Sequence, residues 1–385
     1  MIYFDNASST KPSKEVLEAY LNAAENYYEN PNSIHKLGMK NLNEINRIRG
    51  RILKALNLSQ DYEVVFTSGA TESNNLGIIG YYNKNKNRGN HIITTKIEHD
   101  SVLNVFKHLE EIGAQVTYLD VNDQGEIDIE EFKKVINKNT ILVSIMPVNN
   151  ELGFVLNIDE ISKIVRTFPK CVLHCDCVQT LGKYPFDYNL ADMITISGHK
   201  INGLKGSGVL IKKKRIGLEP LVYGGGQENG LRSGTMDYPG ILALCVAIEN
   251  TVKNFPINYK KVGDLRGYLV ENLKNCEEIK LNLFKKQCPF VLNITLKTKK
   301  ASVVVEALSN EDILVSSVSA CNSRREAPSH VLLALRRPEE EAYNSIRLSF
   351  NKNNTLDEAK TFVDVFTRVI SSIKGRTLWN IMLLS

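Results

Sequence analysis

The sequence has 385 residues, which favours two or three domains, and its 43% hydrophobic and 24% charged residues are the balance of a soluble globular protein with a large core. With 48 Lys and Arg against 43 Asp and Glu, the net charge of +5 gives no support to a dedicated nucleic-acid-binding protein. No run approaches the ~20 apolar residues of a membrane span, the chain does not start like a signal peptide, and the seven cysteines lack disulfide-scaffold spacing, so we expect a cytoplasmic protein with reduced thiols.

The first two hundred residues alternate short β-rich runs with segments of helical periodicity. Strands are predicted at Glu63–Thr67, His91–Thr95, Val116–Leu119, Ile141–Met146, Val172–Asp176, Met193–Ser197 and Val209–Ile211. Between them, segments such as Ser101–Ile112 and Ile158–Thr167 repeat apolar residues every three or four positions. This alternation favours an α/β fold with a mainly parallel sheet covered on both faces, where ligands gather at the carboxyl ends of the strands.

The pattern changes near Asn254–Ile257. A long polar helix at about Lys260–Cys276 is followed by predicted strands at Val291–Leu296, Ile313–Ser316 and Ile346–Phe350 and by a closing helix at Leu356–Ile373. We therefore predict a large α/β domain (15–255), a small α+β domain (256–385) and an N-terminal segment (1–14) that packs with the small domain. The apolar stretch Trp379–Leu384 is short and is expected to dock on the body of the protein rather than on a membrane.

A possible anion site follows the first of these strands, where Ser68-Gly69-Ala70-Thr71 opens a predicted helix. Free backbone N–H groups at such a position can bind a phosphate, and Thr71 adds a hydroxyl. For this loop taken alone, an ordinary helix cap is the favoured interpretation. The sequence has no Walker lysine after this loop and no Gly-x-Gly-x-x-Gly after an early strand, so nucleotide hydrolysis and nicotinamide binding lose their usual support.

A carboxylate and a lysine end two successive strands. Asp176 is followed three residues later by Gln179, and the next strand leads into Gly198-His199-Lys200. This pair suits pyridoxal phosphate, because a lysine bonds to its aldehyde and a carboxylate keeps its pyridine nitrogen protonated. His99 is expected on the same rim, where an imidazole could lie against the cofactor ring and shuttle a proton. Each residue by itself could be a cap or a bystander, and it is their order that indicates a site.

Cys321 differs from the other cysteines because its neighbours, Ser316 to Arg325, are too small and polar for a core. Nearby arginines would favour its thiolate, although a harmless surface thiol is the alternative. Cys171, Cys175 and Cys177 gather around one strand, but we expect strand alternation to place them on different faces. Since no second pair of ligands is evident, no metal site is predicted.

Together these motifs resemble the NifS/IscS-type cysteine desulfurases, pyridoxal-phosphate enzymes of the fold-type I, class V aminotransferase superfamily. The resemblance runs nearly end to end and rests on Phe4–Ala7, Thr67–Ser73, Thr95–His99, Val148–Gly153, Asp176–Gln179, Ser197–Lys200, Gly224–Glu228, Arg232–Thr235, Ser319–Cys321 and Ser345–Arg347. The form around Cys321 is similar to the IscS-like rather than the SufS-like group. Val318 stands where that pattern usually has glycine, and Asn229 where arginine is common.

The resemblance implies a homodimer with a seven-stranded, mainly parallel sheet in its large domain and the Cys321 loop in its small domain. The implied reaction removes sulfur from L-cysteine, leaving alanine and a persulfide on Cys321. A sulfur-acceptor protein of iron–sulfur cluster assembly or tRNA thiolation would then take the sulfur, with no direct role for nucleic acid or membrane. A selenocysteine lyase or another class V enzyme is the alternative activity, and a non-catalytic scaffold for sulfur acceptors is the alternative class.

The resemblance also implies a role for each site residue. Lys200 would bond to the cofactor, Asp176 would face its pyridine nitrogen, Gln179 would contact its ring hydroxyl, and His99 would stack on its ring. Ala70, Thr71, Ser197 and His199 would surround its phosphate, with Thr235 contributed across the dimer interface. Asn150 and Arg347 would hold the substrate carboxylate, because an arginine fork matches two oxygens.

Overall fold

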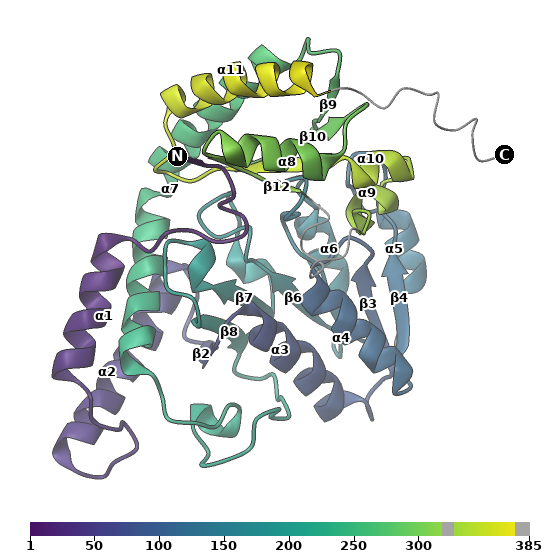
Figure 1. Ribbon diagram of the computed structural model, residues 1–385. Helices are drawn as coiled ribbons and strands as arrows, with labels where there is room; N and C mark the ends of the chain where they lie inside the picture. The colour runs from purple at the N-terminus through teal and green to yellow at the C-terminus, as the bar shows by residue number, and fades with distance from the viewer. Residues whose placement is uncertain (318–326, 374–385) are drawn as a thin grey trace.

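The computed structural model describes residues 1–317 and 327–373. Its central feature is a seven-stranded sheet in the order β2-β8-β7-β6-β5-β3-β4 (Figure 1). These strands are β2 (Tyr62–Thr67), β3 (His91–Thr95), β4 (Gln115–Leu119), β5 (Thr140–Ser144), β6 (Val172–Asp176), β7 (Met193–Ser197) and β8 (Gly208–Lys213). β8 runs antiparallel to β2 and β7, and the other neighbouring pairs are parallel. The mainly parallel seven-stranded sheet is thus confirmed.

Helices cover both faces of this sheet, as predicted. α3 (Ala70–Asn85) and α4 (Asp100–Glu111) cover one face, while α5 (Ile129–Val135) and α6 (Ile158–Val165) cover the other, together with α2 (Lys36–Ala55). Alternate strand residues serve the two faces: Leu142 packs into the cluster of α3 and α4, whereas Val143 packs into the opposite one. This follows from the two-residue period of a strand.

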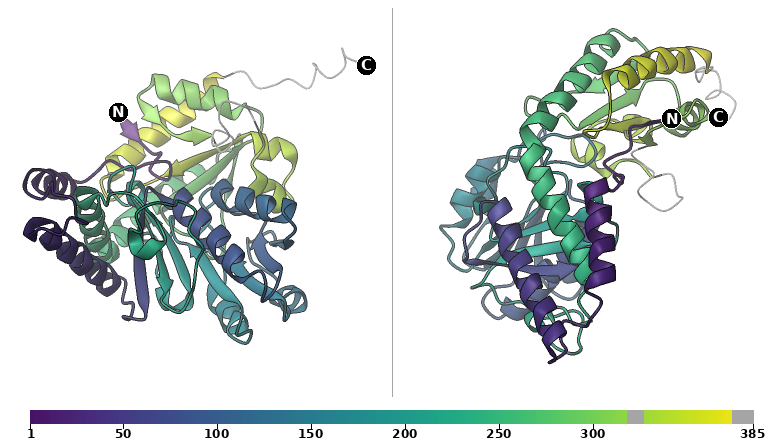
Figure 2. Two further views of the ribbon diagram at one scale, coloured as in Figure 1. Left: turned by 90° about the horizontal axis from the view of Figure 1, so that it is seen from below. Right: turned by 90° about the vertical axis from the view of Figure 1, so that its left-hand side faces the viewer.

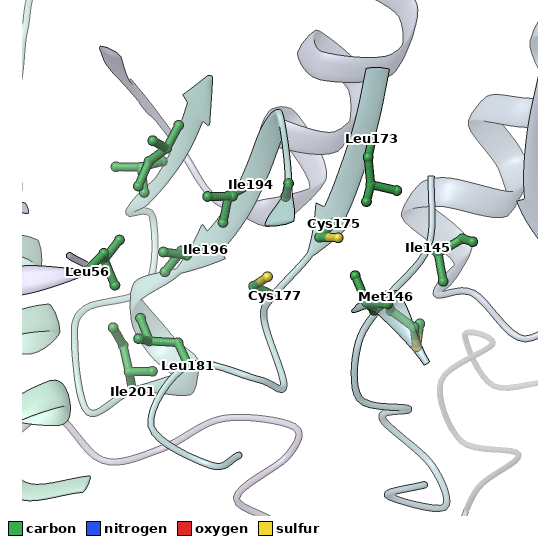
Figure 3. Packing of buried hydrophobic residues seen from close by; sticks show 14 of the residues in the cluster. Leu56, Ile145, Met146, Leu173, Cys175, Cys177, Leu181, Ile194, Ile196 and Ile201 are labelled. Carbon is green, nitrogen blue, oxygen red and sulfur yellow. The ribbon is translucent and has the colours of Figure 1, made fainter. Parts of the chain in front are cut away.

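The positions of three cysteines differ from the prediction made for them. Cys171, Cys175 and Cys177 all lie in one buried apolar cluster, and Figure 3 shows Cys175 and Cys177 in it. The prediction that they occupy different faces was wrong, because even separations along a strand return to the same face. Burial raises the pKa of the Cys175 and Cys177 thiols well above their usual range, which suits core residues. Within residues 1–317 and 327–373 no group of three or more His, Cys, Asp or Glu could hold a metal ion.

The C-terminal part contains an antiparallel sheet in the order β12-β13-β10-β9. Its strands are β9 (Ile279–Asn282), β10 (Val291–Leu296), β12 (Ser316–Ser317) and β13 (Ser345–Ser349); its helices are α8 (Ala301–Asn310), α9 (His330–Ala334), α10 (Glu339–Tyr343) and α11 (Leu356–Ser372). β9 was not predicted, since it is short and carries Lys280. The single strand expected at Ile313–Ser316 is two: β11 (Ile313–Leu314) pairs with β1 (Ile2–Tyr3), and β12 pairs with β13.

A single helix, α7 (Tyr238–Leu273), crosses the expected domain boundary (Figure 2). The prediction of a helix starting near Lys260 was wrong, because α7 starts at Tyr238 and continues through Pro256, although proline lacks a backbone donor. Before Pro256, Leu244 and Ile248 pack with the large sheet, and after it Leu265 and Leu269 pack with the C-terminal cluster. The two halves of α7 thus pack with different clusters, and the division at 255/256, which stays a proposal, would fall within a continuous helix.

The N-terminal segment packs against the C-terminal part before it reaches α1 (Lys14–Asn26). Phe4 is fully buried, with its ring centroid 5.1 Å from that of Phe350 in an edge arrangement and 5.7 Å from that of Phe362. Phe4 therefore packs with the C-terminal part, and the bounds 1–14 of the N-terminal segment stay a proposal. In the described part of the chain no helix is long and apolar enough to cross a membrane. The predictions for Val318, Cys321 and the apolar tail lie outside the described residues.

Candidate active site

A cavity of about 590 Å³ lies at the carboxyl ends of the parallel strands. The N-terminal segment and β13 complete its wall, through Ala7 to Ser9 and Arg347. The predicted site residues that line it are Ala70, Thr71, His99, Asn150, Asp176, Gln179, Ser197, His199, Lys200 and Arg347. Residues from five strand ends and from both sheets therefore meet in one place, as the order of the motifs predicted.

Lys200 ends a short 3₁₀ helix (Gly198–Lys200) that follows β7. Its ammonium donates hydrogen bonds to the backbone carbonyls of Ala7 (2.6 Å) and Ser8 (2.7 Å). The Ala7 carbonyl also accepts from Gln179 Nε2 at 3.1 Å. The N-terminal segment thus positions two predicted cofactor residues. These contacts could not be predicted from a local sequence pattern, because the partners lie 193 and 172 residues apart.

A buried lysine that was not among the predicted site residues also hydrogen-bonds to the side chain of Gln179. Lys183 Nζ donates to Gln179 Oε1 at 2.5 Å. Burial, reinforced by the charge of Lys200, lowers the pKa of Lys183 to about 7. The Gln179 amide is therefore fixed at both of its polar atoms.

Asp176, the last residue of β6, is buried at the floor of the cavity. Its Oδ1 accepts from the Val178 backbone N–H at 3.1 Å, and its Oδ2 accepts from Asn74 Nδ2 at 2.9 Å. Asn74, fully buried on α3, was not among the predicted site residues. These two donors orient the carboxylate and offset the cost of its burial.

His99 is the N-terminal cap of α4, and its Nδ1 accepts from the Ser101 backbone N–H at 3.1 Å. The side chain is open to the cavity yet surrounded by protein atoms, and this burial lowers the pKa of the imidazole. Beneath it, Glu98 is fully buried and accepts from the Thr95 hydroxyl at 2.8 Å and from the Met146 backbone N–H at 3.0 Å. Burial raises the pKa of Glu98 to about 8, so this carboxyl carries a proton at neutral pH.

The start of α3 forms the anion-binding part of the cavity. Gly69 caps the helix with φ +156°, and it has no side chain to accept hydrogen bonds from the first N–H groups of the helix. Gly208 lies so close that a Cβ there would come within 2.6 Å of Gly69 Cα, which keeps this corner clear of side chains. Ser197 and His199 face the same cavity, where burial and the charge of Lys200 lower the pKa of His199 to about 4. Unused N–H groups at a helix start together with hydroxyls suit a phosphate.

Arg347 reaches the cavity from β13. Its Nη1 donates to the Asn150 carbonyl (3.1 Å), and its Nη2 donates to Ser8 Oγ (2.8 Å) and Asp5 Oδ1 (3.2 Å). Arg347 Nε and Asn150 Oδ1 are buried and have no hydrogen-bond partner within residues 1–317 and 327–373. Two residues that line the cavity therefore each keep one buried polar atom without a partner in the described part of the chain.

Comparison with known proteins agrees with this geometry. The aminotransferase class-V family description matches residues 2–362. The chain belongs to the aminotransferase class-V family. A cysteine desulfurase IscS 1 of Archaeoglobus fulgidus is 36% identical over 97% of this chain and 98% of its own length. Among solved structures, a NifS-like protein matches with a TM-score of 0.90, 34% identity and coverage of 97% and 100%. SspA in complex with cysteine matches with a TM-score of 0.79, 36% identity and coverage of 91% and 99%.

Class-V aminotransferases use pyridoxal phosphate, and the resemblance to NifS/IscS-type enzymes is confirmed. The cavity of this class-V chain fits that cofactor in three respects. An amine (Lys200) and a buried carboxylate (Asp176) share the cavity, and the helix start at Gly69 lacks a side-chain cap. His199, whose lowered pKa leaves its imidazole uncharged at neutral pH, lines the same cavity. Two predicted residues stand apart: Thr235 is exposed and is not among the described residues that line the cavity, and Cys321 lies outside the described residues.

Proposed function

We propose that this chain is a cysteine desulfurase that converts L-cysteine to alanine and passes the sulfur onward as a persulfide of Cys321. The observation that carries the proposal is the meeting of Lys200, Asp176 and the α3 start in one cavity, in a chain aligned over nearly its full length with a cysteine desulfurase. Pyridoxal phosphate bound there supplies an electron sink for bond changes at the Cα and Cβ of the substrate. The remaining chemistry belongs to side chains of this chain.

The residues divide the binding work by their chemistry. Lys200 would hold the cofactor through its amine, and Asp176 would keep a proton on the pyridine nitrogen. Thr71, Ser197 and His199, with the backbone at Ala70, would hold the phosphate, and Gln179 would contact the ring hydroxyl. Each lines the cavity.

Substrate orientation and proton transfer fall to other residues. The unpartnered Arg347 Nε–H supports a role for this guanidinium in holding the carboxylate of L-cysteine, beside Asn150. The Lys200 amine, displaced by substrate, would take the Cα proton, and His99 would exchange a proton with the substrate thiol. The Cys321 thiolate would attack the substrate sulfur, forming an S–S bond while the carbon–sulfur bond breaks. The electron pair of the broken carbon–sulfur bond stays with the three-carbon fragment of the substrate, which becomes alanine after protonation.

We also infer that the active unit is a homodimer. Several large apolar side chains are exposed on α1, α2 and the loop between them: Leu17, Leu21, Tyr28, Ile34, Leu37, Met39 and Leu42. Such a concentration of apolar surface is typical of an interface. Thr235, which is exposed and does not line its own cavity, would then complete the phosphate site of the second subunit. The sulfur acceptor, of iron–sulfur cluster assembly or tRNA thiolation, would meet this dimer in the cytoplasm.

The test is turnover of L-cysteine by the purified chain, with alanine and protein-bound sulfur both quantified. We expect one alanine for each sulfur removed, no turnover by Lys200→Ala, and unchanged turnover by the exposed control Lys214→Ala. Turnover of L-selenocysteine without turnover of L-cysteine would instead identify a selenocysteine lyase. Absence of any alanine from cofactor-loaded protein would reject the proposal.

A further inference from the structure

A chain of hydrogen bonds joins Asp176 to His99 through Asn74 and Ser101, two residues to which the proposed function gives no part. Asn74 Nδ2 lies 2.9 Å from Asp176 Oδ2 and 2.9 Å from Ser101 Oγ. Ser101 Oγ lies 2.9 Å from His99 Nδ1. The chain bridges α3, which carries Asn74, and the first turn of α4, which carries Ser101; these helices lie side by side on one face of the sheet (Figure 1).

The direction of each hydrogen bond follows from the groups at the two ends. An ionised carboxylate can only accept, so Asn74 must present its NH₂ group rather than its oxygen to Asp176. Its second amide hydrogen then points to Ser101 Oγ. The cost of this orientation is visible, because Asn74 Oδ1 is buried and has no partner in the described part of the chain. Asp176 thus dictates how the Asn74 amide is turned.

At the other end, two donors converge on one imidazole nitrogen. Since Ser101 Oγ accepts from Asn74, its own hydrogen can be donated to His99 Nδ1. The Ser101 backbone N–H, which can only donate, reaches the same nitrogen at 3.1 Å. An imidazole nitrogen that accepts two hydrogen bonds carries no proton, and the proton of the neutral ring is then on Nε2.

We propose that Asn74 and Ser101 are positioning residues that hold His99 in the tautomer with Nδ1 unprotonated and Nε2 protonated. His99 then presents a donor to the cavity in its neutral state. What this donor serves rests on the proposed function: it would hydrogen-bond to the substrate sulfur or give it a proton, and it could not act as a base through Nε2. The tautomer itself does not depend on that function.

The charged groups around His99 are consistent with a neutral ring. Asp176 and Asp100 raise the pKa of His99, whereas Lys200 and His330 lower it. Burial has the largest effect and lowers the pKa, so the neutral ring prevails at pH 7. The choice of tautomer is therefore the property that matters in the resting protein.

The test is ¹⁵N NMR of the full-length chain labelled at histidine, recorded with and without pyridoxal phosphate. The seven histidines are few enough for the His99 signals to be assigned by their absence from His99→Asn. We expect an unprotonated Nδ1 and a protonated Nε2 in both samples. A protonated Nδ1 would overturn the proposal, and this result is independent of whether the protein turns over L-cysteine.

Variants separate positioning from general stability. Ser101→Ala removes one of the two donors to Nδ1, and Asn74→Ala frees the Ser101 hydroxyl to accept instead. Each should raise the proportion of the Nδ1–H tautomer and raise the His99 pKa by roughly half to one pH unit, the shift that one hydrogen bond supports. Ser101→Thr keeps the hydroxyl and should restore both readouts.

The matched control is Asn75→Ala, at the next position of α3, where Asn75 Nδ2 donates to the Thr71 carbonyl at 2.8 Å and takes no part in the chain. It should leave the His99 signals unchanged. If Asn74→Ala does not fold, the comparison of Ser101→Ala with Ser101→Thr is sufficient to test whether the side chains set the His99 tautomer. An unchanged tautomer and pKa in Ser101→Ala would show that the backbone N–H suffices, and would refute the role of the side chains.

Discussion

Arg347 offers a quantitative test of how the substrate is held. Its guanidinium is almost fully buried, with 4% of the side chain exposed, and three hydrogen bonds occupy three of its five N–H donors. If the substrate carboxylate takes a remaining donor, its loss costs about 1.5–3 kcal/mol, the value of a hydrogen bond to a charged group. The KM for L-cysteine should therefore rise roughly 10- to 100-fold in Arg347→Lys, since 1.4 kcal/mol is about tenfold. Because the interaction is made equally in the ground and transition states, kcat should change little.

The assay compares two substrates in steady-state kinetics of the wild type and of Arg347→Lys. Cysteamine has the amine and thiol of cysteine but no carboxylate, so the variant and the wild type should use it equally well. Loss of the contact between Arg347 and Asp5 is not expected to unfold the variant, because Asp5 retains access to water. Equal losses with both substrates would refute the reasoning, since they would show that Arg347 supports the site without binding the carboxylate.

Three further changes test other parts of the account. Cys321→Ala should abolish sulfur release while leaving cofactor absorbance intact; continued release would reject this nucleophile. Glu98, with its pKa raised from 4.5 to about 8, binds a proton that the unfolded chain releases, so between about pH 5 and pH 8 the melting temperature of the wild type should fall relative to that of Glu98→Gln. An identical pH profile of the two proteins would contradict the assignment. Phe4→Ala should lower the free energy of unfolding by about 3–5 kcal/mol in urea titration; a loss below about 1 kcal/mol would contradict its packing role.

The large sheet could be predicted because its strands are short, apolar and separated by periodic helices. Its strand ends also revealed Asp176 and Lys200, since Asp176 is the last residue of β6 and Lys200 lies three residues after the end of β7. The course of α7 could not be predicted, because a proline after an apolar segment normally marks a boundary and only tertiary packing on both sides carries the helix through Pro256.

The supporting residues of the site were missed for a different reason. Asn74 reaches Asp176 over 102 residues, and Ala7 and Ser8 reach Lys200 over more than 190. Their side chains and carbonyls have no distinctive local pattern, and their role exists only once α3 and the N-terminal segment are packed. The role of Cys321 stays a prediction from sequence and family resemblance.

The most direct test of the central claim locates the cofactor on the chain. Borohydride reduction fixes a bond between an amine and the cofactor aldehyde, and peptide mapping by mass spectrometry then identifies the modified lysine. We predict that the label is on Lys200, which lines the cavity beside Asp176. A label on Lys183 or Lys205 instead, or an unlabelled chain after incubation with pyridoxal phosphate, would contradict the account.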